Sequence, residues 1–271
     1  MQKRLVVANQ KGGVAKTTTA VNLAASLGHL GKKVLLIDLD PQANATSGIG
    51  IDKSKVGKSI YDLLIGQGDI EAIILETPTQ NVHLIPANLP LVGAEIELVH
   101  APRREFRLAD SILKNTSINQ YDFVIIDTPP SLGLLTINAF TAAQSVLIPM
   151  QCEYYALEGL AQLYQTIQLV RQKSNPGLSI EGLVFSMVDT RANLTVQVMD
   201  EVKKILKEKV YETVIPRNVR LAEAPSFGKP IADYDKHSRG AEAYERLAKE
   251  FLARHEPSPI VQNIPQEVAP V

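Results

Sequence analysis

Short apolar runs alternate along this chain with longer segments of helical periodicity, and this alternation limits the possible folds more than any other feature. The apolar runs cover residues 5–8, 34–37, 82–85, 123–126, 146–148 and 183–185. Helical patterns cover residues 17–30, 103–115, 134–143, 156–173, 194–209 and 239–255, and 216–234 is expected to be loop-rich with one helical turn at 221–224. Continuously apolar strands separated by helices predict an α/β fold, with a mostly parallel twisted sheet flanked by helices on both faces.

Composition favours one ordinary globular domain. The 271 residues include 28 Lys and Arg against 29 Asp and Glu, for a formal net charge of −1. A single cysteine, Cys152, excludes an intramolecular disulfide and a metal site built from several thiolates of one chain. We see no signal peptide and no apolar stretch of about 18 residues, so we expect a cytoplasmic protein without a membrane span. The predicted domain is 1–255, and the proline-rich segment 256–271 is predicted to be a disordered tail.

The segment Ala8–Ala20, ANQKGGVAKTTTA, lies between the first strand and the first helix and predicts a phosphate-binding loop. The strict pattern G-x-x-x-x-G-K-[ST] fails, because Gln10 and Ala15 stand where its glycines belong. Gly12 and Gly13 still let backbone N–H groups turn toward phosphate oxygens, and the helix N-terminus adds unpaired donors. The sequence therefore predicts a P-loop NTPase.

Within this loop, Lys16 is expected to reach the β- and γ-phosphates of a nucleoside triphosphate, and the Thr17 hydroxyl to ligate Mg²⁺. Lys11 is a second lysine that a simple phosphate cradle does not need, and surface charge is its plainer interpretation. The expected nucleotide-binding residues of the loop are Lys11, Gly12, Gly13, Val14, Ala15, Lys16, Thr17 and Thr18.

Acidic residues follow two of the predicted strands. Asp127 ends the apolar run FVIID, an arrangement that delivers one carboxylate to magnesium, although an aspartate capping the next turn is the alternative. Asp38 and Asp40 end the second strand, where a carboxylate can orient water or complete a Mg²⁺ shell. We expect Asp38 to have a structural role or to act through its neighbours.

The runs KGGVAKTT, VLLIDLDPQAN and YDFVIIDTPPSLG resemble the deviant Walker A ATPases, and within them the ParA/Soj partition proteins. The resemblance runs from about Lys3 to Leu252 and includes PMQCEYYALEGL, IPRNVRLAEAPSFGKPI and SRGAEAYERLAKEF. It implies that ATP and Mg²⁺ hold two subunits face to face in a homodimer, with Lys11 reaching the partner's phosphates. It further implies slow ATP hydrolysis with Lys11, Lys16 and Asp40 as the catalytic residues, Asp40 positioning the attacking water.

The same resemblance assigns Pro216, Arg217 and Asn218 to the base of the nucleotide. It also places Gln151 and Glu153 at the border of the nucleotide interface, with helix capping as an equal alternative. This chain has Ala15 where the family has glycine, immediately before the lysine that contacts the phosphates. We expect nucleotide binding to survive this methyl group, and dimer closure or hydrolysis to be weakened.

Basic residues late in the chain can bind the phosphates of double-stranded DNA without sequence preference, and solvated helix faces are an equal alternative when these residues are considered without the resemblance. The resemblance points to Arg191 and Arg220, and Lys203 and Lys204 belong to the same basic segment. No helix-turn-helix or aromatic pattern accompanies these residues, so base readout is not expected. The expected function is a nucleoid-associated switch that segregates a chromosome origin or a plasmid, and a ParB-type centromere-binding partner stimulates hydrolysis.

Three other functions were weighed against this one. A MinD-like ATPase that acts on a membrane would end in a basic amphipathic helix, whereas this chain ends in an acidic, proline-rich segment. An iron–sulfur reductase of the nitrogenase iron-protein type is disfavoured by the lone Cys152. A small-molecule P-loop kinase is disfavoured by the second lysine and the late motifs. An ATPase of the same type that positions a protein compartment stays open.

Overall fold

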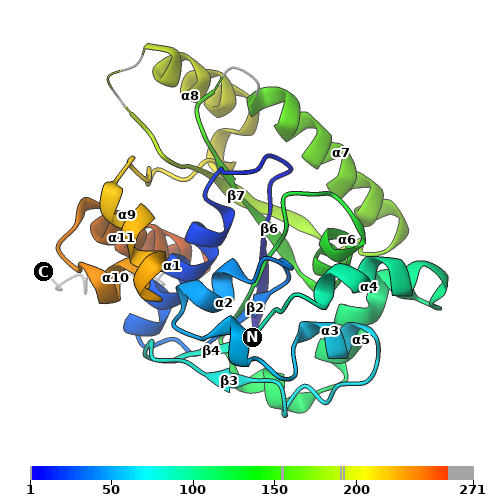
Figure 1. The fold of residues 1–271 in the computed structure, drawn as a ribbon. Coiled ribbons are helices and arrows are strands. Elements are labelled where there is room, and N and C mark those ends of the chain that lie inside the picture. Colours follow the sequence, from blue (N-terminus) through cyan, green and yellow to red (C-terminus); the bar gives the residue numbers. More distant parts are fainter. Residues whose placement is uncertain (1, 154–155, 190, 192, 256–271) are drawn as a thin grey trace, which may run out of the picture.

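The computed structural model describes residues 2–153, 156–189, 191 and 193–255, and these form a seven-stranded sheet between two layers of helices (Figure 1). The strand order is β3-β4-β2-β5-β1-β6-β7, with every neighbouring pair parallel except β3 and β4. The strands are β1 (Lys3–Val7), β2 (Val34–Asp38), β3 (Leu75–Glu76), β4 (Val82–Ile85), β5 (Phe123–Asp127), β6 (Ser145–Met150) and β7 (Ser179–Phe185). The predicted α/β fold class is confirmed.

Eleven α-helices are found in the described part of the chain. They are α1 (Lys16–His29), α2 (Asn44–Gly48), α3 (Ile60–Leu64), α4 (Leu91–Glu97), α5 (Arg107–Leu113), α6 (Leu134–Ala142), α7 (Ala156–Lys173), α8 (Asn193–Leu206), α9 (Val219–Glu223), α10 (Ile231–Tyr234) and α11 (Arg239–Ala253). Among the described residues, no helix combines the length and apolar character needed to cross a bilayer.

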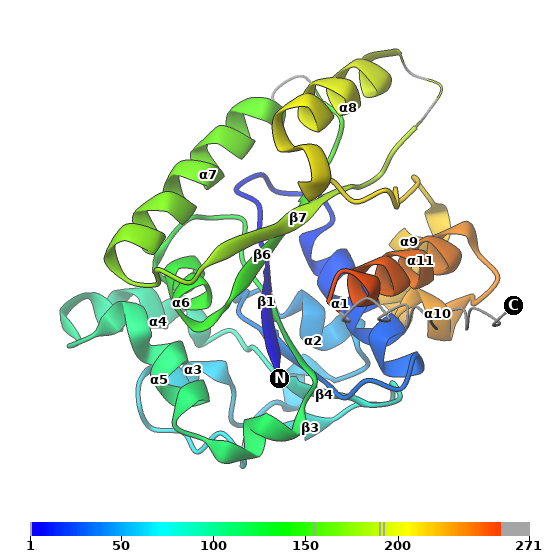
Figure 2. The same cartoon turned by 180° about the vertical axis from the view of Figure 1, so that it is seen from behind.

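The two faces of the sheet carry separate hydrophobic cores. Alternate residues of β1 point to opposite faces: Val6 joins the core beneath helices α3 to α8, and Leu5 and Val7 join the core beneath α1, α10 and α11. Figure 2 shows α1 and α11 together on one side of the sheet, with α7 on the other. Because both faces are covered, the central strands are apolar throughout, which is why the sequence pattern predicts them.

The register of the central strands sets the position of the acidic residues. Val7 at the end of β1 pairs with Asp127 of β5, and Asp127 pairs with Asp38 of β2. All three strands are parallel, so their carboxyl ends meet at one edge of the sheet. The segment that follows β1 therefore begins beside two buried carboxylates.

The structure differs from the sequence prediction in its shortest elements. The helix expected over 103–115 is interrupted, because Arg103 adopts a left-handed φ of 53° and a 3₁₀ turn at Arg104–Phe106 precedes α5. Segment 216–234 contains the short helices α9 and α10 and is less loop-rich than predicted. Strand β3 and helices α2, α3 and α4 were not predicted. The tail 256–271 lies outside the described residues.

Candidate functional site

The loop between β1 and α1 turns through two residues in the left-handed region of backbone space. Gly13 has φ 73°, and Ala15 has φ 65° and ψ 32°. The carbonyl of Ala15 accepts the first hydrogen bond of α1, from the Thr19 N–H at 2.9 Å. An L-residue with a side chain pays about 1–2 kcal/mol for this conformation, whereas glycine does not. A glycine at position 15 would adopt this left-handed conformation without strain, whereas Ala15 is strained.

Side chains from three parts of the chain hold the loop in place. Asn9 donates to the Pro149 carbonyl at 2.8 Å and accepts from the Lys11 N–H at 3.1 Å. Gln151 Nε2 donates to the Gly13 carbonyl at 2.9 Å, and Ser186 Oγ donates to the Val14 carbonyl at 3.0 Å. These contacts come from the ends of β6 and β7. None of these four hydrogen bonds uses the N–H group of Gly12 or Gly13.

Lys16 lies beneath the loop and is only 6% exposed. Its Nζ donates to the Lys11 carbonyl at 2.9 Å. Burial lowers the pKa of Lys16, and the nearby carboxylates of Asp127 and Asp40 oppose that shift. A buried cation whose printed partner is a loop carbonyl therefore lies at the start of α1, where a helix N-terminus supplies the unpaired N–H groups that a phosphate needs.

Asp127 is fully buried, and neither of its carboxylate oxygens has a hydrogen-bond partner. Burial raises its pKa well above the usual range, and Asp38 and Asp40 add to the rise. The neighbouring Thr17 and Lys16 offset part of that shift, although no hydrogen bond of ordinary geometry reaches the carboxylate. An unsatisfied carboxylate beside a threonine hydroxyl suits a hard divalent cation with oxygen ligands, so the residues present fit Mg²⁺.

Asp38 is also fully buried, but its carboxylate has partners. It accepts from the Thr46 N–H at 2.7 Å, from Thr46 Oγ1 at 2.8 Å and from the Asp40 N–H at 3.1 Å. Burial raises its pKa to about 6 against these hydrogen bonds. Asp38 therefore holds α2 and the turn at Asp40, in agreement with the structural role expected for it.

Asp40 lies at the end of that turn and is 7% exposed. Its Oδ1 accepts from the Gln42 N–H at 2.9 Å. Its charge acts on both Lys16 and Asp127. The sequence-predicted residues Lys16, Thr17, Asp40 and Asp127 are thus brought together.

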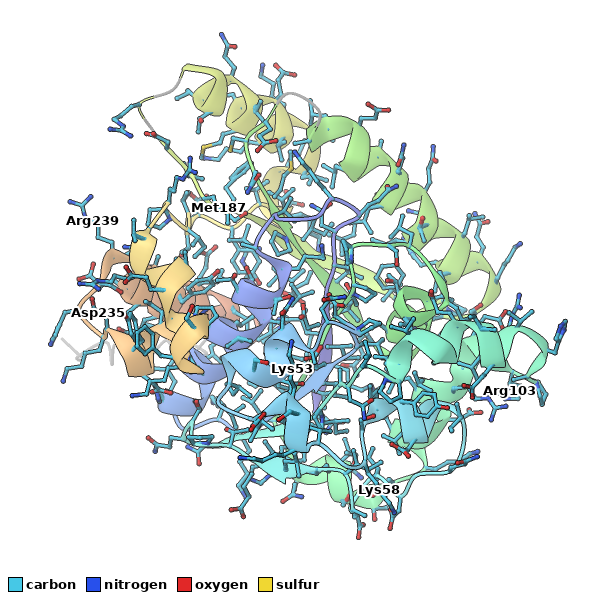
Figure 3. All side chains as sticks on the ribbon, viewed as in Figure 1. Lys53, Lys58, Arg103, Met187, Asp235 and Arg239 are labelled. Atoms are coloured by element: carbon cyan, nitrogen blue, oxygen red, sulfur yellow. The ribbon has the colours of Figure 1, made fainter. Side chains whose placement is uncertain are left out.

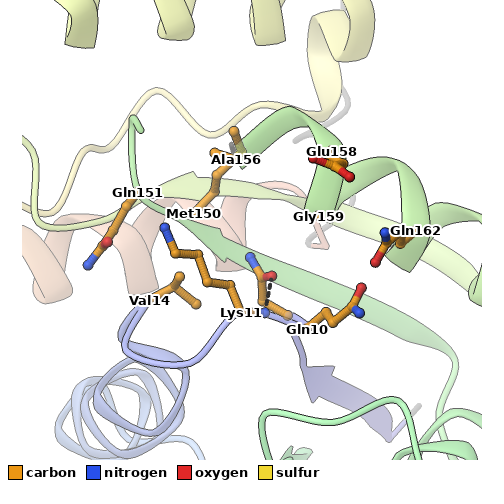
Figure 4. A pocket seen from close by; sticks show the side chains of 10 residues that line it. Gln10, Lys11, Val14, Met150, Gln151, Ala156, Glu158, Gly159 and Gln162 are labelled. Carbon is orange, nitrogen blue, oxygen red and sulfur yellow. Dashed lines mark hydrogen bonds between the residues drawn. The ribbon is translucent and has the colours of Figure 1, made fainter. Parts of the chain in front are cut away.

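Lys11 points away from that group. Its Nζ forms an ion pair with Glu153 Oε2, while 39% of the Lys11 side chain stays exposed. Lys11 lines a pocket of about 240 Å³ between the phosphate loop and α7. Figure 4 shows the Lys11 side chain extending into this pocket beside Met150 and Gln151. The Lys11 side chain is therefore paired within its own subunit, and only the Lys11 backbone carbonyl contacts Lys16.

The predicted base-binding residues reach the same edge of the sheet through β7. Val188 forms a parallel bridge with Pro216, and the Arg217 N–H donates to the Val188 carbonyl at 3.2 Å. Asn218 caps α9 by accepting from the Arg220 N–H at 2.8 Å, so its Oδ1 is already engaged. The exposed Met187 (Figure 3), at a left-handed φ of 52°, lies next to this bridge, and sequence reasoning missed it.

The predicted DNA-binding residues lie outside this group. Arg191 precedes α8 and forms a bidentate pair with Asp189, which holds the pKa of that carboxyl at about 2. Lys203 and Lys204 lie on α8, and Lys204 pairs with Glu201 at 2.9 Å. Arg220 lies on α9 and pairs with Glu223 at 2.9 Å. Three of the four cations are therefore partly neutralised by near neighbours in sequence.

Comparison with known proteins identifies the family. A sequence profile described as an AAA domain matches residues 2–180. The sporulation initiation inhibitor protein Soj of Bacillus subtilis is 57% identical over 254 residues, which span 93% of this chain and 99% of that protein. The chain belongs to the ParA/Soj family of partitioning ATPases. The chromosome partitioning protein ParA of Myxococcus xanthus is 51% identical over 253 residues, spanning 93% of this chain and 89% of that protein.

Solved structures agree with the ParA/Soj fold. Cobyrinic acid a,c-diamide synthase from Mycobacterium smegmatis, with bound ADP and magnesium, has a TM-score of 0.81 at 38% identity, covering 94% of this chain and 95% of that one. The septum site-determining protein MinD from Pyrococcus horikoshii, complexed with Mg-ADP, has a TM-score of 0.78 at 26% identity, covering 96% and 100%. The predicted family resemblance and P-loop NTPase fold are confirmed.

The strain at Ala15 generates a stability prediction. Ala15→Gly should raise the free energy of unfolding by about 1 kcal/mol, because glycine adopts the left-handed conformation without the steric cost. The greater conformational entropy of glycine in the unfolded chain offsets only part of this gain. Urea titration of the nucleotide-free protein measures it. Ala161→Gly, at an exposed position inside α7, is the control and should lower stability by roughly 0.5–1 kcal/mol. A loss of stability in Ala15→Gly would contradict the assignment of strain.

The unpartnered Asp127 carboxylate generates a second prediction. Asp127→Asn should stabilise the nucleotide-free chain by on the order of 1–3 kcal/mol at pH 7.5, because it removes a buried charge that has no hydrogen-bond donors. An acid whose folded pKa is raised favours folding at low pH, and that contribution is lost as the pH rises through the folded pKa. The advantage of Asp127→Asn should therefore grow as the pH rises from about 4.

Asp38→Asn is the matched control for this experiment. Asp38 accepts three hydrogen bonds, so its amide replacement should destabilise the chain in the same urea titrations. If both variants lose stability equally at every pH, Asp127 is not an unsatisfied charge.

Proposed function

We propose that this chain is an ATP-dependent DNA-partitioning switch. ATP binding with Mg²⁺ would join two copies through their nucleotide faces, and the dimer would bind DNA without sequence preference. The observation that carries the proposal is the pair of buried, poorly partnered charges Lys16 and Asp127 at the junction of the glycine-containing loop and α1. Family membership supports the ATPase and partitioning roles, since the relatives are named as partitioning proteins and ATPases.

The chain's own residues have distinct tasks in this proposal. The N–H groups of residues 12–18 bind phosphate oxygens, and Lys16 exchanges its contact with the Lys11 carbonyl for the β- and γ-phosphates. Thr17 and Asp127 would hold Mg²⁺, which neutralises charge on the phosphates when bound. Asp40 orients the attacking water from the turn that Asp38 supports. Pro216, Arg217 and Asn218 lie along the base, where the Asn218 amide nitrogen stays available.

Lys11 acts on the partner subunit in this proposal. In the single subunit it is paired with Glu153, so it must leave that carboxylate before it can reach phosphates across an interface. Both side chains are substantially exposed, so water weakens the pair and the exchange costs little. Hydrolysis is slow in one subunit because the positive charge that completes the site comes from the other. A ParB-type partner would accelerate it and release the dimer from DNA, which implies a cytoplasmic, nucleoid-associated protein.

Sedimentation velocity with DNA binding tests the function as a whole. Purified chain should double its mass with ATP and Mg²⁺ but not with ADP, and Ala15→Gly should dimerise more tightly because the methyl group before Lys16 is gone. DNA affinity should appear only with the dimer and fall steeply with salt. ATP binding without a mass change in either protein would overturn the proposed switch.

Substitutions of the two members of the Arg191–Asp189 ion pair should change DNA affinity in opposite directions. Arg191→Ala should weaken ATP-dependent DNA binding and reduce the salt slope by about 1 per subunit. Asp189→Asn should strengthen DNA binding, because it frees Arg191 and removes a negative charge that repels phosphates. Fluorescence anisotropy with random duplex DNA across a salt series measures both.

Glu71→Gln removes one negative charge at an exposed position after α3 and controls for net charge in this series. If Asp189→Asn and Glu71→Gln raise the DNA affinity equally, the gain reflects total charge and the Arg191 site is not involved.

A further inference from the structure

Helix α4 carries apolar side chains on two opposite faces. Leu91, Ala94 and Leu98 are buried against the core. A second set is exposed and spaced three, four and three residues apart: Leu89 (74% exposed) in the turn before α4, Val92 (54%) and Ile96 (74%) on α4, and Val99 (45%) in the 3₁₀ turn that follows it. We call these four residues the α4 stripe. Single exposed hydrophobic residues are ordinary, whereas several along one helix face mark an interaction surface.

Other exposed hydrophobic side chains of the described residues are dispersed. They are Leu113 on α5, Tyr164 and Leu169 on α7, Met187 after β7, Val196 and Ile205 on α8, Val219 on α9 and Phe227 after α9. None of these belongs to a run at helical spacing like that of α4. The α4 stripe is therefore a distinct surface.

The α4 stripe adjoins the nucleotide face through the loop that follows Asp127. On α4, Glu95 Oε1 accepts from the Leu135 N–H at 3.5 Å, and it lies so close to Gly133 that a Cβ there would collide with it. At the other end of this loop, a Cβ on Gly12 would be 3.9 Å from Pro130 Cβ. Gly12 therefore lies near Pro130, and residues 130–133 connect this point to the segment held by Glu95 of α4.

We infer that the α4 stripe packs against a second copy of this chain in the nucleotide-dependent dimer, an inference that rests on the proposed function. In the phosphate loop Gly12 and Gly13 are exposed and Lys11 is half-exposed, so the loop presents little apolar side-chain area. A stable homodimer interface has a core that is about 65% apolar and buries about 800 Å² of each partner. The α4 stripe supplies the apolar area that the phosphate loop lacks.

Charge around the stripe also favours a copy of the same chain. Arg104 donates to the Val99 carbonyl at 2.7 Å and pairs with Glu105, while Glu97 accepts from the Tyr61 hydroxyl. Arg103 extends from the same end of the molecule (Figure 3). Arg103 and Arg104 therefore lie near the stripe together with Glu95, Glu97 and Glu105, so its rim carries charges of both signs. A balanced rim can face its own copy without net repulsion, whereas a strongly basic or acidic partner would need a rim of one sign.

Burial of the α4 stripe would act on the nucleotide site of its own subunit. Glu95 holds α4 against residues 133–135, which directly follow the loop after Asp127. A second copy seated on the stripe would fix α4 and therefore limit the movement of this loop. Dimer contact and the γ-phosphate side of the site are coupled by one short helix.

Two surface variants test this assignment. Ile96→Asn should weaken ATP-dependent dimerisation at least tenfold, and Leu113→Asn, 64% exposed on α5, should leave it unchanged. Sedimentation velocity of the full chain with ATP and Mg²⁺ measures the dimer, in the wild type and in the Ala15→Gly background. Binding of a fluorescent ATP analogue to dilute monomer should stay within twofold for both. A dimer of Ile96→Asn as tight as the parent would overturn the inference.

Alkylation of an introduced cysteine tests it without weakening the surface. In a Cys152→Ser background, Ile96→Cys should react with a maleimide at least tenfold more slowly with ATP and Mg²⁺ than without, while Leu113→Cys should react equally in both. If the mass doubles but the alkylation rate of the Ile96→Cys variant is unchanged, the stripe lies outside the dimer and the proposed function survives. If ATP does not double the mass in either background, the proposed function itself fails.

Discussion

The structure depends on a buried carboxylate and a buried lysine that do not fully satisfy each other. Asp127 has no hydrogen-bond partner on either oxygen, and Lys16 donates only to a loop carbonyl. Burying such groups is unfavourable unless something else completes them. The fold keeps them because β5 lies beside β1, in a register that pairs Val7 with Asp127. A phosphate and a divalent cation at this edge would satisfy both groups at once.

The loop above these charges is held from outside its own segment. Asn9, Gln151 and Ser186 bind its backbone or its neighbours, and they lie on or after three different strands. The same region contains Met187 and the bridge from Val188 to Pro216. A change at the nucleotide would therefore reach the ends of β6 and β7 directly.

Six of the seven strands were predictable, because strands covered on both faces are continuous apolar runs. Strand β3 has two residues, and α2, α3 and α10 have four or five, so no periodicity could develop in them. Helix α4 escaped prediction for another reason: its apolar residues occupy two faces, and this obscures the single stripe of an ordinary surface helix. The residues around the phosphate loop were recognised because they are consecutive. Ser186 and Met187 were missed because they are far from the loop in sequence.

The sequence by itself determined the α/β class, the phosphate loop and the two strand-end aspartates, since these follow from local patterns and neighbouring residues. Only the tertiary structure decided which aspartate is satisfied and which is not, because that depends on hydrogen bonds from Thr46 to Asp38 that no spacing reveals. It likewise decided that Lys11 is paired with Glu153, 142 positions away, and that Ala15 adopts a left-handed backbone. Contacts between distant segments form only when parallel strands bring their carboxyl ends together, so the chemistry of the site belongs to the folded sheet.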